Sequence, residues 1–400
     1  MNDFLTLQSN SRRIPSIDRY RGLALALMIA FGAAKMLVGV PFFEGLSTHD
    51  LSHAVLLLDG YAFYDLGAPV FIFVSGLSFG LSYLSLERRF GETKALGALA
   101  QRALKTIGVG ALLILYPMDA VGIVSLVLMI AAILFVIVWM VLAAKGKQVG
   151  RTMGRIMHVF LLSMGAMLLA VAVVDNALLA AGKAVGGTHW SVLASIGVSM
   201  LVCVPLVRLS TPRKVVGAVV LTVAYWALNR LVPAAFFCHW THGGILGALG
   251  YALLYYYALT VVELARKHRF LAYLFALTLV VAAYLSLLHV TPSKSAVNLS
   301  YVLVSFAFAY PIFLVVQLFD DVPTKPNAIF TLYGRNALLV YLIHTFITFP
   351  MGICINALIE YVGLTGFLGV LVGFVGMALY VLLMAHWLRL LQRKGFSLRL

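Results

Sequence analysis

The sequence is dominated by apolar runs, each long enough to cross a lipid bilayer as a helix, which takes about 20 residues. Of the 400 residues, 62% are hydrophobic and only 11% are charged, whereas soluble domains carry about 25% charged residues. We therefore predict an all-α, polytopic integral membrane helix bundle of about twelve spans, with about ten as the lower limit, and a single domain over residues 1–400. The predicted spans lie near 21–43, 61–84, 101–117, 119–143, 156–182, 191–209, 214–232, 244–264, 270–289, 298–318, 336–358 and 365–390.

The positions of Lys and Arg predict the orientation in the membrane. If the N-terminus is cytoplasmic, all but four of the 29 Lys and Arg residues fall in cytoplasmic segments or at cytoplasmic span ends, in accord with the positive-inside rule. We therefore expect both termini in the cytoplasm and a multi-pass protein of a cell inner membrane. The net charge of +15 is then explained by basic loops that face anionic membrane lipids, and nucleic acid is not expected as a partner. The four exceptions are Lys35, Lys183, Arg230 and Lys294.

Ionisable residues gather between the first two predicted spans, in the segment THDLSHAVLLLDGYAFYDLGAP. In the predicted orientation this segment is extracytoplasmic, and ionisable groups at a bilayer edge are often functional. The histidine side chain titrates near neutral pH and is therefore suited to act as a general base. His53 is the favoured base, and His49, which has the same chemistry but lies earlier in the segment, is favoured less. Asp65, where the second span begins, is suited to orient an imidazole ring, as a carboxylate does in a catalytic triad. The other carboxylates, expected to be loop and turn residues, are Asp50 and Asp59.

A second group of charged residues lies at the predicted cytoplasmic ends of two spans. The stretch SIDRYRG contains Asp18, Arg19 and Arg21, and the stretch LYGRN contains Arg335 and Asn336. These arginines either anchor the spans at the interface, with Asp18 favourable near a helix N-terminus, or face the bundle and hold a phosphate group, for which guanidinium is well suited. The sequence leaves both interpretations open.

One histidine is predicted inside the bilayer. His344 follows Arg335 by nine residues, which corresponds to about 13 Å along a helix and places it near mid-membrane. It is either a hydrogen-bonded packing residue or part of a proton pathway.

No metal site is expected from the sequence. The cysteines Cys203, Cys238 and Cys354 are far apart and form no CxxC pair, so we interpret them as small packing residues. His239 and His242 are three residues apart, but no third ligand of suitable spacing accompanies them.

These motifs follow one another in an order that resembles the transmembrane acyltransferase superfamily, and in particular its branch similar to heparan-alpha-glucosaminide N-acetyltransferase. The first motif is S-x-D-x-x-R-G-L-A-L-x-L-M from Ser16, followed by an extracytoplasmic histidine. The second is D-L-x-x-P-x-F-x-F-x-x-G-x-S from Asp65, and the third is G-R-N-A-L-x-x-Y-x-x-H from Gly334. The resemblance is clearest over residues 12–105 and 330–346, and the middle third is similar mainly in its span pattern.

The resemblance implies an acyltransferase that takes an acyl group, usually acetyl, from cytoplasmic acyl-CoA and delivers it to an extracytoplasmic sugar or glycan acceptor. His53, twelve residues before Asp65, stands where the family has its catalytic histidine, and Asp65 is the aspartate of the second motif. Acetyl-CoA is the expected acyl donor, without a metal. The residues expected to hold its phosphates are Arg19, Arg21, Arg335 and Asn336.

Two departures from the family pattern leave the acceptor open. Gly32 stands where the family's acetyltransferases often carry Asn, and HAVLLLDG replaces the usual His-x-x-Trp-Asn-Gly run. The alternative function is a proton-coupled transporter or flippase in which intramembrane His and Asp residues relay protons. Besides membrane lipids and the acceptor, the sequence leaves open whether two copies of the chain associate as a homodimer.

Overall fold

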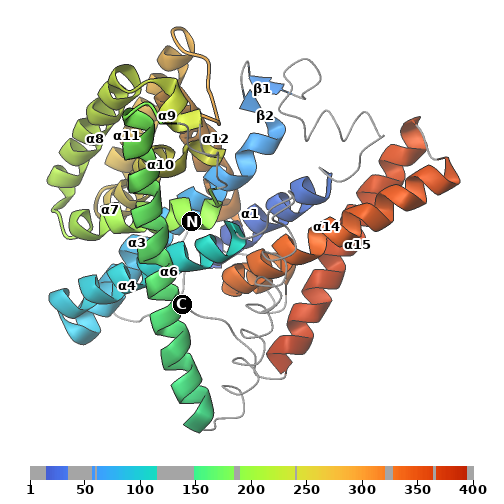
Figure 1. The fold of residues 1–400 in the computed structure, drawn as a ribbon. Helices are drawn as coiled ribbons and strands as arrows, with labels where there is room; N and C mark the ends of the chain where they lie inside the picture. The colour runs from blue at the N-terminus through green and yellow to red at the C-terminus, as the bar shows by residue number, and fades with distance from the viewer. Residues whose placement is uncertain are drawn as a thin grey trace. The chain divides into compact units, whose positions relative to one another are not determined.

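The computed structural model of the 400-residue chain describes residues 15–34, 56–58, 61–114, 148–183, 190–238, 241–319, 328–363 and 366–393. Nearly all of these residues are helical (Figure 1). The elements are α1 (Pro15–Ala34), β1 (Leu56–Leu58), β2 (Tyr61–Ala62), η1 (Phe63–Leu66), α3 (Gly67–Phe90), α4 (Glu92–Ile114), α6 (Gln148–Ala180), α7 (Val192–Leu206), α8 (Thr211–Leu231), α9 (Ala234–Cys238), η2 (Thr241–Gly243), α10 (Gly244–Lys267), α11 (Arg269–Leu287), α12 (Leu299–Leu318), α13 (Ile329–Arg335), α14 (Ala337–Val362) and α15 (Gly366–Arg393).

The span predicted near 119–143 lies outside the described residues. Each of the other predicted spans overlaps a described helix, although the span near 61–84 begins in β2 and η1 and the span near 21–43 continues beyond the described residues. Among the described helices, seven are long and apolar enough to cross a membrane, namely α3, α6, α8, α10, α11, α12 and α15. The strands β1 and β2 form a short antiparallel pair. The chain is therefore an all-α membrane protein, as predicted, while the number of spans and their orientation stay predictions.

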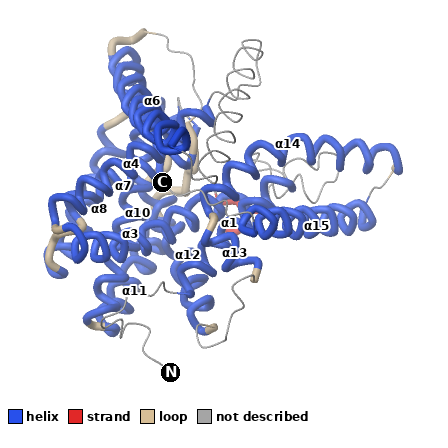
Figure 2. Tube along the Cα trace, turned by 90° about the horizontal axis from the view of Figure 1, so that it is seen from below, coloured by secondary structure: helices blue, strands red, loops and turns tan. Residues whose placement is uncertain are grey.

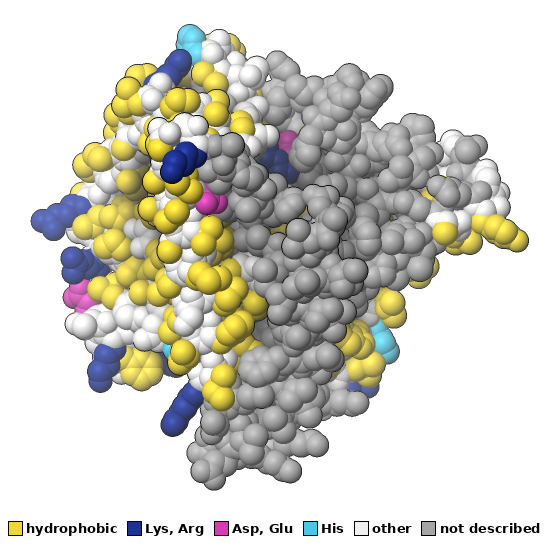
Figure 3. All heavy atoms as spheres, viewed as in Figure 1, with side chains coloured by type: hydrophobic (Ala, Val, Ile, Leu, Met, Phe, Trp, Pro, Cys, Tyr) yellow, Lys and Arg dark blue, Asp and Glu magenta, His cyan; other side chains and the backbone are white. Residues whose placement is uncertain are grey.

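Apolar side chains cover much of the outer surface of these helices. On α8, Val216, Val219 and Trp226 are all more than half exposed, and the described surface in Figure 3 is mainly hydrophobic, with only scattered Lys and Arg. An apolar surface of this extent is not stable in water, because soluble proteins rarely expose large contiguous apolar patches. It is the surface expected of helices that are surrounded by lipid chains.

The chain forms two compact units. The first consists of Met1–Val74 with Ala307–Arg399, and the second contains Ser75–Phe306. The helices α3 and α12 each begin in one unit and end in the other. The prediction of one domain over residues 1–400 stays a prediction.

The second unit is built around α10, most of which is buried. It packs against α7, α8 and α11, and a Cβ atom built on Gly76 of α3 would crowd the Tyr255 backbone. Small residues of this kind let membrane helices approach closely.

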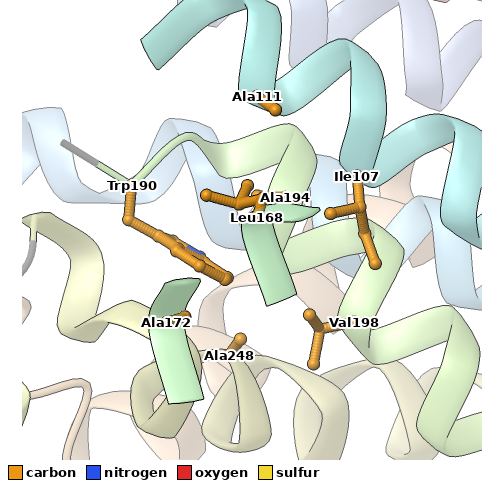
Figure 4. Packing of buried hydrophobic residues seen from close by; sticks show 8 residues of the cluster. All are labelled: Ile107, Ala111, Leu168, Ala172, Trp190, Ala194, Val198 and Ala248. Carbon is orange, nitrogen blue, oxygen red and sulfur yellow. The ribbon is translucent and has the colours of Figure 1, made fainter. Parts of the chain in front are cut away.

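A hydrophobic cluster beside α10 includes Trp190, whose ring lies among Leu168, Ala172 and Ala248 in Figure 4. The indole Nε1 donates a hydrogen bond of 2.9 Å to Ser195 Oγ, so the ring is both packed and oriented.

The first unit contains α1, α13, α14 and α15, and α14 and α15 run side by side in Figure 2. Tyr20 of α1 is fully buried, and its hydroxyl donates a 2.6 Å hydrogen bond to the Ala309 carbonyl of α12. Its ring also packs against Phe73 and Phe313. A buried tyrosine needs a partner for its hydroxyl, so this contact fixes α1 against the second half of α12.

Candidate functional site

Two glycines bring the first and third motifs into direct contact. A Cβ atom built on Gly334 of α13 would overlap the Asp18 carbonyl oxygen of α1, and one built on Gly22 would overlap the Phe330 carbonyl oxygen. Since only glycine lacks a Cβ atom, only glycine permits this backbone-to-backbone packing. The short helix α13 therefore lies directly on the first turns of α1, although more than 300 residues separate them in the sequence.

Asp18 is the centre of the charged group at this contact. Its side chain is 11% exposed, Oδ1 lies 3.3 Å from Arg21 Nη1, and Oδ2 lies 3.9 Å from Arg335 Nε. The Arg21 Nη1 group also donates a 3.1 Å hydrogen bond to the Gly334 carbonyl. One carboxylate thus orients two guanidinium groups from opposite ends of the sequence. We call Asp18, Arg21 and Arg335 the α1–α13 cluster.

Arg19 has a different position from its neighbour Arg21. It is buried, with 8% of its surface exposed, and its guanidinium donates a hydrogen bond to the carbonyl of Phe319, the residue after α12. A cation that binds the last carbonyls of a helix satisfies groups that lack an intrahelical partner and interacts favourably with the helix dipole. Arg19 therefore caps α12, a role that the sequence did not predict.

Asn336 joins α13 to α14. Its side-chain Nδ2 donates to the Leu332 carbonyl (2.8 Å), its backbone N–H donates to Tyr333 (3.1 Å), and its carbonyl accepts from the Val340 N–H (2.9 Å). Asn336 is buried, with 5% of its surface exposed, and its hydrogen bonds stabilise the bend between α13 and α14. Of the four residues predicted to hold phosphate, Arg21 and Arg335 are the more exposed, with side chains 21% and 39% accessible.

Asp65 lies in η1, directly before α3. It is 4% exposed, and Oδ2 accepts a 2.9 Å hydrogen bond from the Ala62 N–H of β2. The Tyr61 hydroxyl approaches the Asp65 carbonyl at 3.5 Å. A carboxylate here also lies favourably near the N-terminus of α3. Asp65 therefore orders the entry to α3.

The partner predicted for Asp65 falls outside the described residues. The residues of the loop to which this applies are His49, Asp50, His53 and Asp59. The pairing of His53 with Asp65 accordingly stays a prediction.

His344 lies within α14, and its ring is 6.4 Å from that of Tyr380 of α15, measured between centroids. This contact between two apolar helices is compatible with His344 as a packing residue and with His344 as part of a proton pathway.

The described residues contain no group of three or more His, Cys, Asp or Glu that is arranged to hold a metal ion. His239 lies outside them, and nothing is described of the Cys354 side chain. Cys203 is buried, in accord with a packing role, but Cys238 is exposed at the end of α9, so the packing interpretation is wrong for Cys238. A cysteine in a short helix between spans need not share the apolar environment of the spans themselves.

A second charged group, in the second unit, was not anticipated. The Glu263 carboxylate of α10 lies near three cations: Lys267 Nζ at 3.0 Å, Lys214 Nζ at 3.8 Å and Arg266 Nη1 at 3.9 Å. The i, i+3 and i, i+4 spacing of Glu263, Arg266 and Lys267 was visible in the sequence. The contribution of Lys214, from α8, could not be read from spacing.

The fold and these charged groups define a class: a polytopic, all-α membrane protein with partly buried ion pairs at helix ends. No protein-family model matches the chain, and a search of curated proteins finds no match.

Proposed function

We propose that the chain is a transmembrane acyltransferase of an inner membrane, with about twelve spans and both termini in the cytoplasm. It moves an acyl group, in the first instance acetyl, from cytoplasmic acyl-CoA to an extracytoplasmic sugar or glycan. The observation that carries the proposal is the α1–α13 cluster: the two sequence motifs that it joins are the first and last of those that resemble acyltransferases.

The charge of the cluster suits the polar end of acyl-CoA. The cluster as defined contains two positive charges, on Arg21 and Arg335, and one negative charge, on Asp18. Charge-assisted hydrogen bonds from guanidinium to phosphate are strong and often bidentate. Asp18 holds the two guanidinium groups in place, so they lose less freedom when a phosphate binds. The positive-inside distribution puts this cluster on the side where acyl-CoA occurs.

In the proposed reaction, His53 accepts the proton of the acceptor hydroxyl or amine as that group attacks the thioester carbonyl. The new bond joins the acceptor oxygen or nitrogen to the acyl carbon, the carbon–sulfur bond breaks, and CoA leaves as the thiolate. In a two-step variant the imidazole of His53 takes the acyl group first and then passes it to the acceptor. Asp65 orients His53 in both variants.

The test uses purified protein in detergent. Acetyl-CoA should raise the thermal midpoint of the wild type by mass action, and Arg21→Ala and Arg335→Ala should each weaken the apparent affinity about tenfold or more, as expected for loss of a hydrogen bond to a charged group. Arg89→Ala is the matched control, because Arg89 is an exposed arginine at the end of α3, outside the cluster. Equal effects of Arg21→Ala and Arg89→Ala would remove the cluster from the proposal.

The chemistry is tested separately, with radiolabelled acetyl-CoA. Wild-type protein should transfer the label to an added sugar or release it as acetate, and His53→Ala should lower this rate by about a hundredfold or more while leaving stabilisation by CoA intact. The alternative is a transporter or flippase in which His344 of α14, whose ring lies near that of Tyr380 of α15, takes part in a proton relay. It predicts proton-coupled uptake in proteoliposomes that is lost in His344→Ala, and no response to any acyl-CoA.

A further inference from the structure

Lys214 occupies an unfavourable position for a cation. It lies in the first turn of α8, which begins at Thr211, and its side chain is only 5% exposed. The N-terminal end of a helix carries a partial positive charge and favours anions. Burial of an ammonium group is costly in addition, unless the charge is well compensated.

The compensation for Lys214 is incomplete. Glu263, at 3.8 Å, also pairs with Lys267 and Arg266, so one carboxylate serves three cations within the described residues. The Thr211 hydroxyl accepts a 2.7 Å hydrogen bond from Lys267 Nζ and is 3.3 Å from Glu263 Oε1. Arg266 and Lys267 are ordinary at the C-terminal end of α10, where the dipole favours cations. The helix dipole does not account for the position of Lys214, which is a cation at the N-terminal end of α8.

We propose that a group of residues at the start of α8 and the end of α10 binds a phosphate group. We call this group the α8–α10 cluster; its members are Thr211, Lys214, Glu263, Arg266 and Lys267. An anion there would compensate the two excess positive charges and interact with the positive end of α8, in the manner of phosphates at other helix N-termini. Lys267, with a side chain 54% exposed, and Arg266, 23% exposed, leave the cluster open to a ligand. Thr211 supplies a neutral hydroxyl beside them.

The surroundings favour the headgroup of an anionic phospholipid as the source of the phosphate. The exposed apolar residues Val216, Val219 and Val223 follow on α8, where acyl chains would lie. Basic groups at the cytoplasmic ends of spans are attracted to anionic lipids by about 1 kcal/mol each. Inorganic phosphate carries the same charged group, but it has no acyl chains that could pack against these valines.

The experiment measures the thermal midpoint of the full-length protein in detergent with added phosphatidylglycerol, phosphatidylcholine or inorganic phosphate. We expect phosphatidylglycerol to raise the wild-type midpoint by about 3 °C or more, with the other two inactive. In Lys214→Met and Lys267→Ala, about fivefold more phosphatidylglycerol should be needed for the same rise. The control is Lys94→Met, since Lys94 is an exposed lysine of α4.

The outcomes separate the two phosphate sources. A response to inorganic phosphate that both cluster variants weaken would support the site and assign it to a soluble ligand. Equal responses of wild type, Lys267→Ala and Lys94→Met to every addition would overturn it, even if Lys214→Met failed to fold. Arg21→Ala should retain the full response to phosphatidylglycerol, because it lies in the other cluster, and this result separates the inference from the proposed acyl-CoA site.

Discussion

At the scale of single residues, Asp18 holds the α1–α13 cluster together. Asp18→Asn keeps the size of the side chain and removes the charge that Arg21 and Arg335 share at 3.3 and 3.9 Å. Both guanidinium groups would then lose their ion pair with Asp18. We expect a loss of about 1–3 kcal/mol in stability, less than for a fully buried pair because both arginines are partly exposed.

A thermal melt of Asp18→Asn beside wild type measures this loss. Glu92→Gln is the control, because Glu92 pairs with Arg208 at 3.4 Å and both side chains are half exposed, a situation in which an ion pair contributes little. If the two variants melted at the same temperature, Asp18 would have no organising role.

The sequence predicted that Arg19, Arg21, Arg335 and Asn336 would hold phosphate, and the structure gives these residues different surroundings. Arg21 and Arg335 lie beside Asp18, whereas Arg19 caps α12 and Asn336 joins α13 to α14. The capping role of Arg19 could not be foreseen, because its acceptor, the Phe319 carbonyl, is a backbone group that every residue type has. The role of Lys214 was hidden for a different reason: its partner, Glu263, lies on another helix.

At the scale of elements, the contact between α1 and α13 depends on Gly334. Gly334→Ala places a methyl group where the Asp18 carbonyl oxygen now lies, so α13 must shift. Forcing extra atoms into a packed contact typically costs about 1–3 kcal/mol. Because the shift also separates Arg335 from Asp18, we expect the response to acetyl-CoA to weaken together with the thermal midpoint.

The matched control for Gly334→Ala is Gly97→Ala. Gly97 lies inside α4, and a Cβ atom there would meet nothing within 4 Å. Alanine is favoured over glycine in a helix interior by about 1 kcal/mol, so Gly97→Ala should leave the protein as stable as wild type or slightly more stable. A Gly334→Ala variant with wild-type stability and an unchanged response to acetyl-CoA would contradict the close packing.

Apolar runs predicted where helices occur but not where they end. The span predicted at 101–117 belongs to α4, which already begins at Glu92, because a helix can continue beyond the apolar region through polar residues that hydropathy does not register. The short helix α13 was missed, since seven residues cannot span a bilayer. The β1–β2 pair was missed because the runs LLL and YA carry no period-2 signal.

At the scale of the whole molecule, composition alone identified the membrane class, since 11% charged residues cannot cover the surface of a soluble protein of 400 residues. Orientation rests on a different signal, the position of Lys and Arg, and it has a direct chemical test. The predicted topology puts Cys238 outside the cytoplasm, between the spans that contain α8 and α10, and its side chain is exposed.

We expect a membrane-impermeant maleimide to label Cys238 in intact cells that carry the protein with Cys203→Ala and Cys354→Ala. Although Cys238 is exposed, desolvation by the protein around it raises the pKa of its thiol. Less thiolate is then present at neutral pH, so the labelling rate should increase as the pH of the medium is raised. The control moves the cysteine to the predicted cytoplasmic side: Lys94→Cys in a chain that also carries Cys238→Ala should react only after the membrane is permeabilised. Labelling of Lys94→Cys alone in intact cells would show that the orientation is the reverse of the predicted one, and labelling of both sites would contradict the prediction. Either result would remove the reason for assigning the α1–α13 cluster to the side where acyl-CoA occurs.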